Sequence, residues 1–273
     1  MDSRVAIIAG AGRFPLYVAQ EAKRQGMTVV ALAVKGWADA SLAASVDAYE
    51  DIAIGQLGRL IERLRCHQVR QVIMAGKVTK EVLVSRGASF DLEALALLGR
   101  AKDFSAAALL GAVGERLERE GITLLDSSAF LKASLCPAGV LTARGPTAEE
   151  RDDIDAGLRV ARTLASLDVG QTVVVKQRVV VAVEALEGTD AAIRRAHALA
   201  GEGLVVVKTA APNQDRRFDL PIVGTDTMVT LSESGVSCLA LEAGLTLLLE
   251  REALITKADD AKICVVGVAP AAS

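Results

Sequence analysis

The sequence predicts an α/β protein: an N-terminal Rossmann-like domain with a parallel sheet and a C-terminal α/β domain with a mixed sheet. Short apolar runs alternate with helical patterns from residue 4 to residue 125, as in parallel strands joined by crossover helices. A second block of this kind follows a stretch rich in proline and glycine. The predicted domains are residues 1–133 and 147–273, and residues 134–146 are the predicted linker.

The first block begins with a strand at Arg4–Ala9, which ends at the glycine turn 10–12. Pro15 suits the first turn of a helix, because the N–H that proline lacks would be unpaired there. Asp91 and Asp103 are candidate N-caps of helices in an alanine- and leucine-rich region. Further elements of this block are strands at 27–34, 71–75 and 123–125, and helices at 57–66 and within 91–120.

The second block opens with a helix from Thr147 to about Leu167, since Thr147 and Glu150 have the spacing of a capping box. Valine-rich runs predict a hairpin, and the sequence Gly188-Thr189-Asp190 predicts a helix start. The predicted strands of this block are 172–176, 178–185, 204–208, 236–241 and 262–268. The polar stretch 209–221 is long for a loop in a compact domain, which favours a functional segment.

Composition excludes several classes of protein. The chain has 273 residues, and 31 basic against 34 acidic side chains give a net charge of −3, which excludes nucleic-acid binding by general charge. No apolar run approaches the ~20 residues of a membrane-spanning helix. The cysteines are far apart without a CxxC pair, so we expect buried thiols rather than a zinc site; they are Cys66, Cys136, Cys238 and Cys264. A cytoplasmic protein is expected.

Two glycine-containing turns are candidate phosphate contacts. Gly10 and Gly12 follow the first strand, where backbone N–H groups can approach a phosphate at the start of a helix. Lys77 follows another strand and could contact phosphate as a point charge. Pro15 in place of a third glycine, and Lys35 where an acidic ribose ligand is expected, argue against NAD. A simple tight turn and a solvated lysine remain the alternatives.

Carboxylates gather at the ends of elements in the second block. They are Asp168, Glu184, Glu187, Asp190, Asp219 and Asp226. Magnesium at a phosphate uses such a sparse set, namely one or two carboxylates, several waters and the phosphate oxygens. N-capping is the alternative for Asp190 and Asp226, whereas Asp219 has no capping pattern behind it. Neither a GxSxG elbow nor Walker-A spacing is present, which disfavours a serine hydrolase and a P-loop enzyme.

Taken together, the motifs resemble those of the UDP-2,3-diacylglucosamine pyrophosphatases of the LpxI type, from the lipid A pathway of Gram-negative bacteria. The longest and most specific matches are the stretches at 181–195 and 205–224. The matching stretches are AIIAGAGRFP (6–15), AGKV (75–78), DIDAG (153–157), LDVGQTVVV (167–175), VAVEALEGTDAAIRR (181–195), VVVKTAAPNQDRRFDLPIVG (205–224) and LEAGLTLLL (241–249).

This resemblance implies Mg²⁺-dependent hydrolysis of UDP-2,3-diacylglucosamine to 2,3-diacylglucosamine 1-phosphate (lipid X) and UMP, with water attacking the β-phosphorus. It implies that the substrate is held between a Rossmann-like domain and a C-terminal α/β domain. By the DLP segment of the family, Asp219 is essential. Peripheral contact with the inner membrane and a homodimer are expected from the same analogy.

The candidate catalytic residues are Asp219, Asp190 and Glu187, and the candidate Mg²⁺ ligands are Asp219 and Asp190. The candidate substrate contacts are Gly10, Gly12, Lys77, Gln171, Thr189, Lys208 and Gln214. Two alternatives remain open. One is an NAD-linked oxidoreductase that uses the first block, and the other is a non-catalytic nucleotide-binding protein whose acidic residues only cap helices and bind water.

Overall fold

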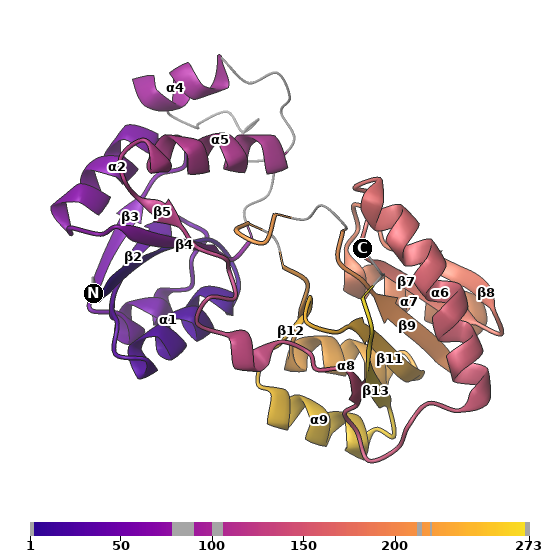
Figure 1. The fold of residues 1–273 in the computed structure, drawn as a ribbon. Helices are drawn as coiled ribbons and strands as arrows, with labels where there is room; N and C mark the ends of the chain where they lie inside the picture. Colours follow the sequence, from indigo (N-terminus) through magenta and orange to yellow (C-terminus); the bar gives the residue numbers. More distant parts are fainter. Residues whose placement is uncertain (1–2, 78–89, 100–105, 212–214, 219, 271–273) are drawn as a thin grey trace. The chain divides into compact units, whose positions relative to one another are not determined.

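The protein folds into two α/β units, shown in Figure 1 in a computed structural model that describes residues 3–77, 90–99, 106–211, 215–218 and 220–270. The first unit contains the described residues up to Leu131 together with the segment 215–218. The second unit begins at Lys132 and contains the other described residues. The chain therefore passes between the units three times, once after Leu131 and once on each side of the segment 215–218.

A five-stranded parallel sheet forms the centre of the first unit, in the order β3-β2-β1-β4-β5. Its strands are β1 (Arg4–Ala9), β2 (Thr28–Val34), β3 (Ala48–Ile52), β4 (Gln71–Ala75) and β5 (Thr123–Leu124). The strand order reverses between β1 and β4, and open α/β sheets bind ligands beyond the carboxyl ends of the strands at such a switch point. This position is where the two candidate turns lie.

Helices cover both faces of the first sheet. They are α1 (Phe14–Arg24), α2 (Leu57–Cys66), α4 (Leu92–Leu98) and α5 (Ala106–Glu118), with a short 3₁₀ helix η1 at Ala40–Ser45. Figure 1 shows α1 on one face and α2 with α5 on the other. The apolar residues of α2 recur at helical spacing, and Leu57, Leu60, Ile61 and Leu64 are all buried against the sheet.

The second unit is built on a six-stranded mixed sheet, in the order β6-β13-β11-β9-β7-β8. Its strands are β6 (Gly139–Val140), β7 (Thr172–Lys176), β8 (Val179–Val183), β9 (Leu204–Lys208), β11 (Val236–Glu242) and β13 (Cys264–Val268). Strands β9, β11 and β13 are parallel to one another, and β7 is antiparallel to both β8 and β9. The predicted fold class, a parallel sheet in the N-terminal part and a mixed sheet in the C-terminal part, is confirmed.

In the described part of the second unit, the α-helices are α6 (Ala148–Ser166), α7 (Thr189–Ala200), α8 (Thr225–Glu233) and α9 (Arg251–Asp260), with a short 3₁₀ helix η2 at Lys132–Ser134. Two apolar clusters lie on opposite faces of the sheet. One cluster packs α6 against Val173 and Val175, and the other packs α7, α8 and α9 against Val174. Side chains of a strand alternate between its two faces, so both faces of β7 are buried. A separate pair of short strands, β10 (Ile222–Val223) and β12 (Leu247–Leu248), also belongs to this unit.

The DIDAG stretch holds α6 and the β7–β8 hairpin in place. Asp153 is buried, and its carboxylate accepts the backbone N–H groups of Gln177 (3.1 Å) and Arg178. Both of those residues have positive φ, as a type I′ hairpin turn requires. At Gly157 a Cβ would lie only 2.7 Å from Val207 Cγ2, so glycine permits α6 to pack closely on the sheet. These residues of the motif have structural roles.

Several helix signals in the sequence are confirmed. Thr147 and Glu150 form the predicted capping box at the start of α6, and Asp91 caps α4 through the N–H of Ala94. The candidate cap Asp103 lies outside the described residues. The prediction of buried thiols is wrong for Cys66, which is exposed at the end of α2, and correct for the other three cysteines.

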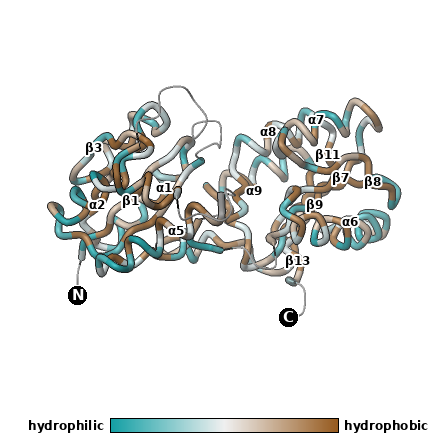
Figure 2. Tube along the Cα trace, turned by 90° about the horizontal axis from the view of Figure 1, so that it is seen from above, coloured by the Kyte–Doolittle hydropathy of each residue, from teal (hydrophilic) through white to brown (hydrophobic). Residues whose placement is uncertain are grey.

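Hydropathy follows this architecture. In Figure 2 hydrophobic segments run along the strands of both units, and hydrophilic segments mark stretches of the helices such as α6. Within the part of the chain that the structure describes, none of the helices combines the length and the apolar character needed to cross a bilayer.

Candidate functional site

Two turns are joined by backbone hydrogen bonds at the switch point of the first sheet. The N–H of Ala11 donates to the carbonyl of Lys77 at 2.8 Å, and the N–H of Lys77 donates to the carbonyl of Ala11 at 2.9 Å. The Gly10 N–H donates to the Ala75 carbonyl at 2.8 Å. The fold thus brings three predicted substrate contacts, Gly10, Gly12 and Lys77, to one place.

The glycines of these turns have a structural reason of their own. A Cβ on Gly10 would lie 2.6 Å from the carbonyl oxygen of Lys77, and Gly76 has a φ of +91° with the backbone of Gly10 and Ala11 equally close. Close approach of the two backbones therefore requires glycine without any ligand. The start of α1 has no side-chain cap, and Lys77 is exposed beside it, so N–H groups and a cation are both placed to receive an anion.

A second group of side chains, here called the Lys208 cluster, lies in the second unit where the carboxyl end of β9 is next to the amino end of β7. It consists of Lys208, Thr172, Thr189 and Glu184. Lys208 is 7% exposed, and its Nζ donates to Oγ1 of Thr172 (3.2 Å) and of Thr189 (3.0 Å). Thr189 Oγ1 donates to Glu184 Oε1 at 2.7 Å. The backbone N–H of Gln171 lies 3.4 Å from Glu184 Oε2. Three of the matching stretches, at 167–175, 181–195 and 205–224, contribute residues to this cluster.

The cluster stabilises a charged carboxylate in a buried position. Burial alone would raise the pKa of Glu184, but the charge of Lys208 and the threonine hydroxyls outweigh it, so that pKa lies below its ordinary value. The Lys208 Nζ lies 3.9 Å from Glu184 Oε2. A fixed ammonium and oriented hydroxyls are suited to binding phosphate oxygens.

An ion pair between half-buried Arg162 and buried Glu242 holds the neighbouring strand end. Glu242, 3% exposed, is the last residue of β11, and its Oε1 accepts Nη2 of Arg162 at 3.0 Å. Its Oε2 accepts the N–H of Ala210 at 3.0 Å, which fixes the start of the 209–221 stretch. The sequence assigned no role to Glu242, Arg162 or Thr172, and it placed Glu184 only among the carboxylates at element ends that could serve a magnesium site. The position of Glu242 inside the matching stretch 241–249 was the available signal.

The other acidic candidates in the described residues lie on the surface. Asp190 is exposed in the first turn of α7, and Asp226 is exposed in the first turn of α8, where an acidic side chain favours the helix without capping it. Glu187 is exposed and pairs with Arg195 at 2.7 Å. Its own backbone N–H and then Arg195 lower the pKa of Glu187. Asp168 is exposed in a turn with a φ of +55°.

Asp219 and Gln214 lie outside the described residues. The described segment 215–218, immediately before Asp219 in the sequence, belongs to the first unit. Its successor Leu220 is buried in the second unit. The chain therefore returns to the second unit between Phe218 and Leu220.

Hydrogen bonds and one aromatic ring fix the segment 215–218 to the first unit. The backbone N–H of Ser127 donates to the Arg216 carbonyl at 2.9 Å, and the buried Ser127 hydroxyl donates to the Arg217 carbonyl at 3.1 Å. Arg216 forms an ion pair with Asp126 at 2.9 Å. Phe218 packs against the apolar cluster beneath α2 and α5. The residues that precede Asp219 are thus held at four points.

Among the described residues, no group of three or more histidine, cysteine, aspartate or glutamate side chains could hold a metal ion. Within those residues, the protein does not supply a complete set of ligands. Magnesium at a phosphate takes only one or two carboxylates, and exposed Asp190, next to Thr189, is chemically suited to that role.

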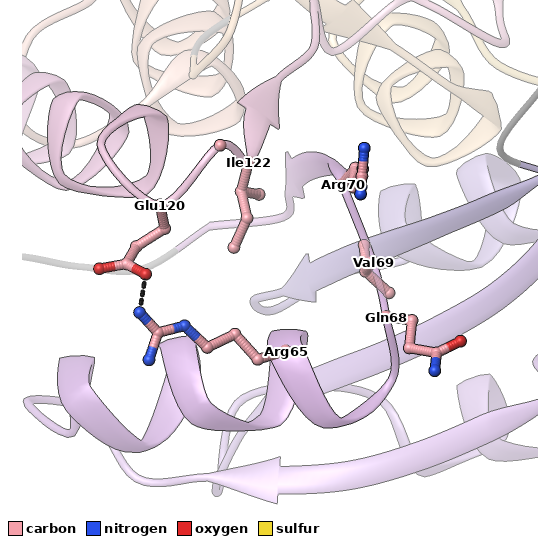
Figure 3. A pocket seen from close by; sticks show the side chains of 7 residues that line it. Arg65, Gln68, Val69, Arg70, Glu120 and Ile122 are labelled. Carbon is pink, nitrogen blue, oxygen red and sulfur yellow. Dashed lines mark hydrogen bonds and ion pairs between the residues drawn. The ribbon is translucent and has the colours of Figure 1, made fainter.

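Figure 3 shows the lining residues of a groove of about 420 Å³ in the first unit. The groove lies at the amino ends of β4 and β5, whereas the glycine turns follow the carboxyl ends of β1 and β4. Its residues precede β4 and β5, and the ion pair of Arg65 with Glu120 spans part of it. Ligands of parallel α/β sheets bind at the carboxyl ends of the strands, whereas this groove lies at their amino ends. The groove therefore does not form part of the candidate site.

Comparison with known protein families identifies two matching profiles. The LpxI N-terminal domain matches residues 4–134, and the LpxI C-terminal domain matches residues 137–266. A curated relative from Caulobacter vibrioides (strain ATCC 19089 / CIP 103742 / CB 15) is named UDP-2,3-diacylglucosamine pyrophosphatase LpxI. It is 33% identical over 282 aligned positions, which cover 98% of each chain.

Two solved structures resemble the chain only distantly. The biotin carboxylase domain of the Hydrogenobacter thermophilus 2-oxoglutarate carboxylase aligns with a TM-score of 0.27 and 14% identity, over 63% of this chain and 34% of that chain. Glycinamide-RNase-transformylase T from Mycobacterium tuberculosis aligns with a TM-score of 0.24 and 19% identity, over 67% of this chain and 44% of that one. At these scores neither structure informs the fold or the site.

Proposed function

The chain belongs to the LpxI family, and we propose that it hydrolyses the diphosphate bond of UDP-2,3-diacylglucosamine in lipid A biosynthesis. The observation that carries this proposal is the 33% identity to a relative of that name over 98% of both chains. The structure supports the proposal because three of the matching stretches contribute residues to the hydrogen-bonded cluster around Lys208. Because both units match the family, the NAD-linked and non-catalytic alternatives lose their basis.

The proposed products are 2,3-diacylglucosamine 1-phosphate (lipid X) and UMP, formed when water attacks the β-phosphorus. The diphosphate carries about two negative charges, which cations must offset as the transition state forms. Lys208 and the hydroxyl of Thr189 would bind phosphate oxygens in the second unit. In the first unit, Lys77 with the glycine turn at Gly10 and Gly12 would bind phosphate oxygens.

Magnesium is the proposed cofactor, with Asp190 and Asp219 as its ligands. When bound, the ion would neutralise charge on the diphosphate oxygens. Exposed Asp190 adjoins the Lys208 cluster through Thr189, which fits an ion shared with the substrate. Asp219 is the proposed catalytic residue, and Glu187, Gln171 and Gln214 complete the proposed site.

The test is hydrolysis of purified UDP-2,3-diacylglucosamine in water enriched in ¹⁸O, with both products analysed by mass spectrometry. We expect UMP and lipid X in equal amounts, and ¹⁸O in the phosphate of lipid X because water attacks the phosphorus bonded to the sugar. EDTA should stop the release of both products, and added Mg²⁺ should restore it. Release of no UMP by the wild-type protein would overturn the proposed function.

Asp219→Ala tests the proposed catalytic residue. We expect a loss of turnover of at least about 10³-fold with an unchanged melting temperature, as for removal of a group that acts directly on the reacting atoms. The matched control is Asp226→Asn, which alters an exposed carboxylate seven residues further along the chain. Wild-type turnover in Asp219→Ala would remove this residue from the mechanism.

The proposed setting is the cytoplasm, with peripheral contact with the inner membrane and a homodimeric assembly. The diacylated substrate would reside in the membrane, which is the reason for expecting contact with it. Flotation with vesicles of anionic phospholipid and light scattering after size-exclusion chromatography test these two points. Recovery of all the protein in the lipid-free fraction, or a monomer mass of 28.5 kDa, would contradict them respectively.

A further inference from the structure

Two threonine hydroxyls connect the Lys208 ammonium to the Glu184 carboxylate in the second unit. Lys208 Nζ donates to Thr172 Oγ1 and Thr189 Oγ1, and the Thr189 hydroxyl donates to Glu184 Oε1 at 2.7 Å. The direction of the bonds is determined, because an ammonium can only donate and a carboxylate can only accept. The Thr189 hydroxyl therefore accepts a hydrogen bond from the lysine and donates its own hydrogen bond to the carboxylate.

We infer that Glu184 and Thr172 are positioning residues, which hold the Lys208 ammonium where it meets a phosphate group of the substrate. This inference rests on the proposed function and adds two residues to the site. Glu184 and Thr172 act through Lys208 and Thr189, and neither is assigned a contact with the reacting atoms.

The pairing of the strands places Thr172 beside Lys208. The two residues are partners in the antiparallel register of β7 and β9, and residues directly opposite each other present their side chains on the same face. Thr172 is 1% exposed, so its hydroxyl cannot turn to solvent and must satisfy its hydrogen bonds within the cluster.

Lysine needs this support more than arginine would. Its ammonium is a point charge on a flexible stem with several rotatable bonds, so it has no intrinsic orientation toward a phosphate. Here two hydroxyls fix its position, and the carboxylate 3.9 Å away offsets the cost of burying its charge. The side chains of Lys208 and Glu184 are 9% and 14% exposed, so bulk water contributes little to either charge.

The decisive test is a double-mutant cycle with Glu184→Gln, Lys208→Met and the combined variant, assayed for turnover of UDP-2,3-diacylglucosamine. Glutamine has the shape of glutamate without its charge. We expect Glu184→Gln to lower kcat about 10- to 100-fold with KM changed less than about 3-fold, as for partners that orient a functional group. The combined variant should be no slower than Lys208→Met alone, because the two residues act as one unit.

A second pair of variants keeps the test valid if Glu184→Gln lowers the melting temperature. Thr172→Val removes the hydroxyl at nearly constant volume, and Thr172→Ser keeps it. The serine variant should retain kcat within about 3-fold, whereas the valine variant should lose about tenfold. Lys176→Met is the matched control. Lys176 lies at the other end of β7 from Thr172, and its Nζ donates to the Ala200 carbonyl at 2.6 Å.

Each outcome is decisive. Turnover of Glu184→Gln equal to that of the wild type would overturn the inference, and so would losses that multiply in the combined variant. Equal losses in Thr172→Val and Thr172→Ser would assign Thr172 a packing role and overturn its part. Failure of the wild-type protein to hydrolyse the substrate would instead overturn the proposed function, so the two failures are distinguishable.

Discussion

At the scale of single residues, neighbouring backbone decides several positions that look functional in the sequence. Gly10 is a candidate phosphate contact by its place after the first strand, yet the carbonyl of Lys77 already leaves no room for a side chain. Asp153 belongs to a matching motif, yet its carboxylate is used by the turn of a hairpin. Residue type and spacing therefore locate a special position without telling whether a ligand or the chain itself requires it.

Gly10→Ala should destabilise the first unit. The new Cβ would lie 2.6 Å from the Lys77 carbonyl oxygen, and backbone cannot move aside as a flexible side chain could. We expect a loss of about 1–3 kcal/mol, measured as a lower midpoint of urea unfolding. Gly111→Ala in α5 is the control, because its Cβ meets no atom within 4 Å, and it should be neutral or slightly stabilising. Equal midpoints for the two variants would contradict the prediction.

Ser127→Ala should loosen the segment that precedes Asp219. The buried hydroxyl shares its one hydrogen between the carbonyls of Met74 and Arg217, and its removal leaves both without this donor. We expect about 1–3 kcal/mol of destabilisation and, if Asp219 is catalytic, a turnover about tenfold lower. Ser166→Ala is the control, since that exposed hydroxyl only donates to Thr163 within α6. If Ser127→Ala is destabilised but turns over substrate at the wild-type rate, the anchoring of the segment 215–218 does not contribute to catalysis.

At the scale of elements, local patterns predicted most of the fold. The strands at Arg4–Ala9 and Leu204–Lys208 are continuous apolar runs, as buried parallel strands are, and the capping box marks the start of α6. Strand β3 was missed because it is an edge strand with polar residues. Helices α8 and α9 were missed because α8 is rich in threonine and α9 buries only Leu254 and Ala258. Tertiary packing, rather than propensity, stabilises these elements.

The candidate site was predictable in part for the same reason. Lys208, Thr189 and Lys77 stand at element ends, which local patterns reveal. The contact of Lys208 with Thr172 depends on the antiparallel register of β7 with β9, which pairs residues 36 positions apart. Long-range register follows from packing of whole strands, so no local pattern of the chain could have identified Thr172 or Glu184 as partners of the lysine.

Asp153→Asn should destabilise the β7–β8 hairpin. An asparagine can offer only one oxygen, whereas the carboxylate accepts the N–H groups of both Gln177 and Arg178. We expect a loss of about 1–3 kcal/mol, seen as a lower unfolding midpoint and faster amide hydrogen exchange in 172–183. Asp152→Asn is the control, because Asp152 is exposed and forms only a surface ion pair with Arg178. A larger effect of Asp152→Asn would contradict the assignment.

At the scale of the whole molecule, acid stability should depend on Glu50. Arg63 donates two hydrogen bonds to this carboxylate and His67 a further contact, and together they lower its pKa from 4.5 to about 2 against the effect of burial. A carboxyl whose pKa is lowered by folding stabilises the protein above its unfolded pKa. That contribution is lost as the pH falls from about 4.5 through about 2.

The comparison of wild type with Glu50→Gln measures this contribution. At pH 7 we expect the variant to melt about 2–4 °C lower, the shift that about 1 kcal/mol produces in a protein of this size. The difference should narrow below pH 4.5 and vanish only below about pH 2, once the wild-type carboxyl is protonated in the folded protein as well. A difference that stays constant over this range would assign the effect to packing instead of charge.

The segment 215–218 also decides how this polypeptide can be divided. It is encoded 84 positions after Leu131, the last residue of the first unit before the chain leaves it. A gene fragment that stops at 131 would yield a protein lacking the ring of Phe218, which lies 3.6 Å from the position of a Cβ on Gly114. Such a fragment would expose that apolar surface to solvent and associate with itself, so the halves are best produced as one continuous translation product.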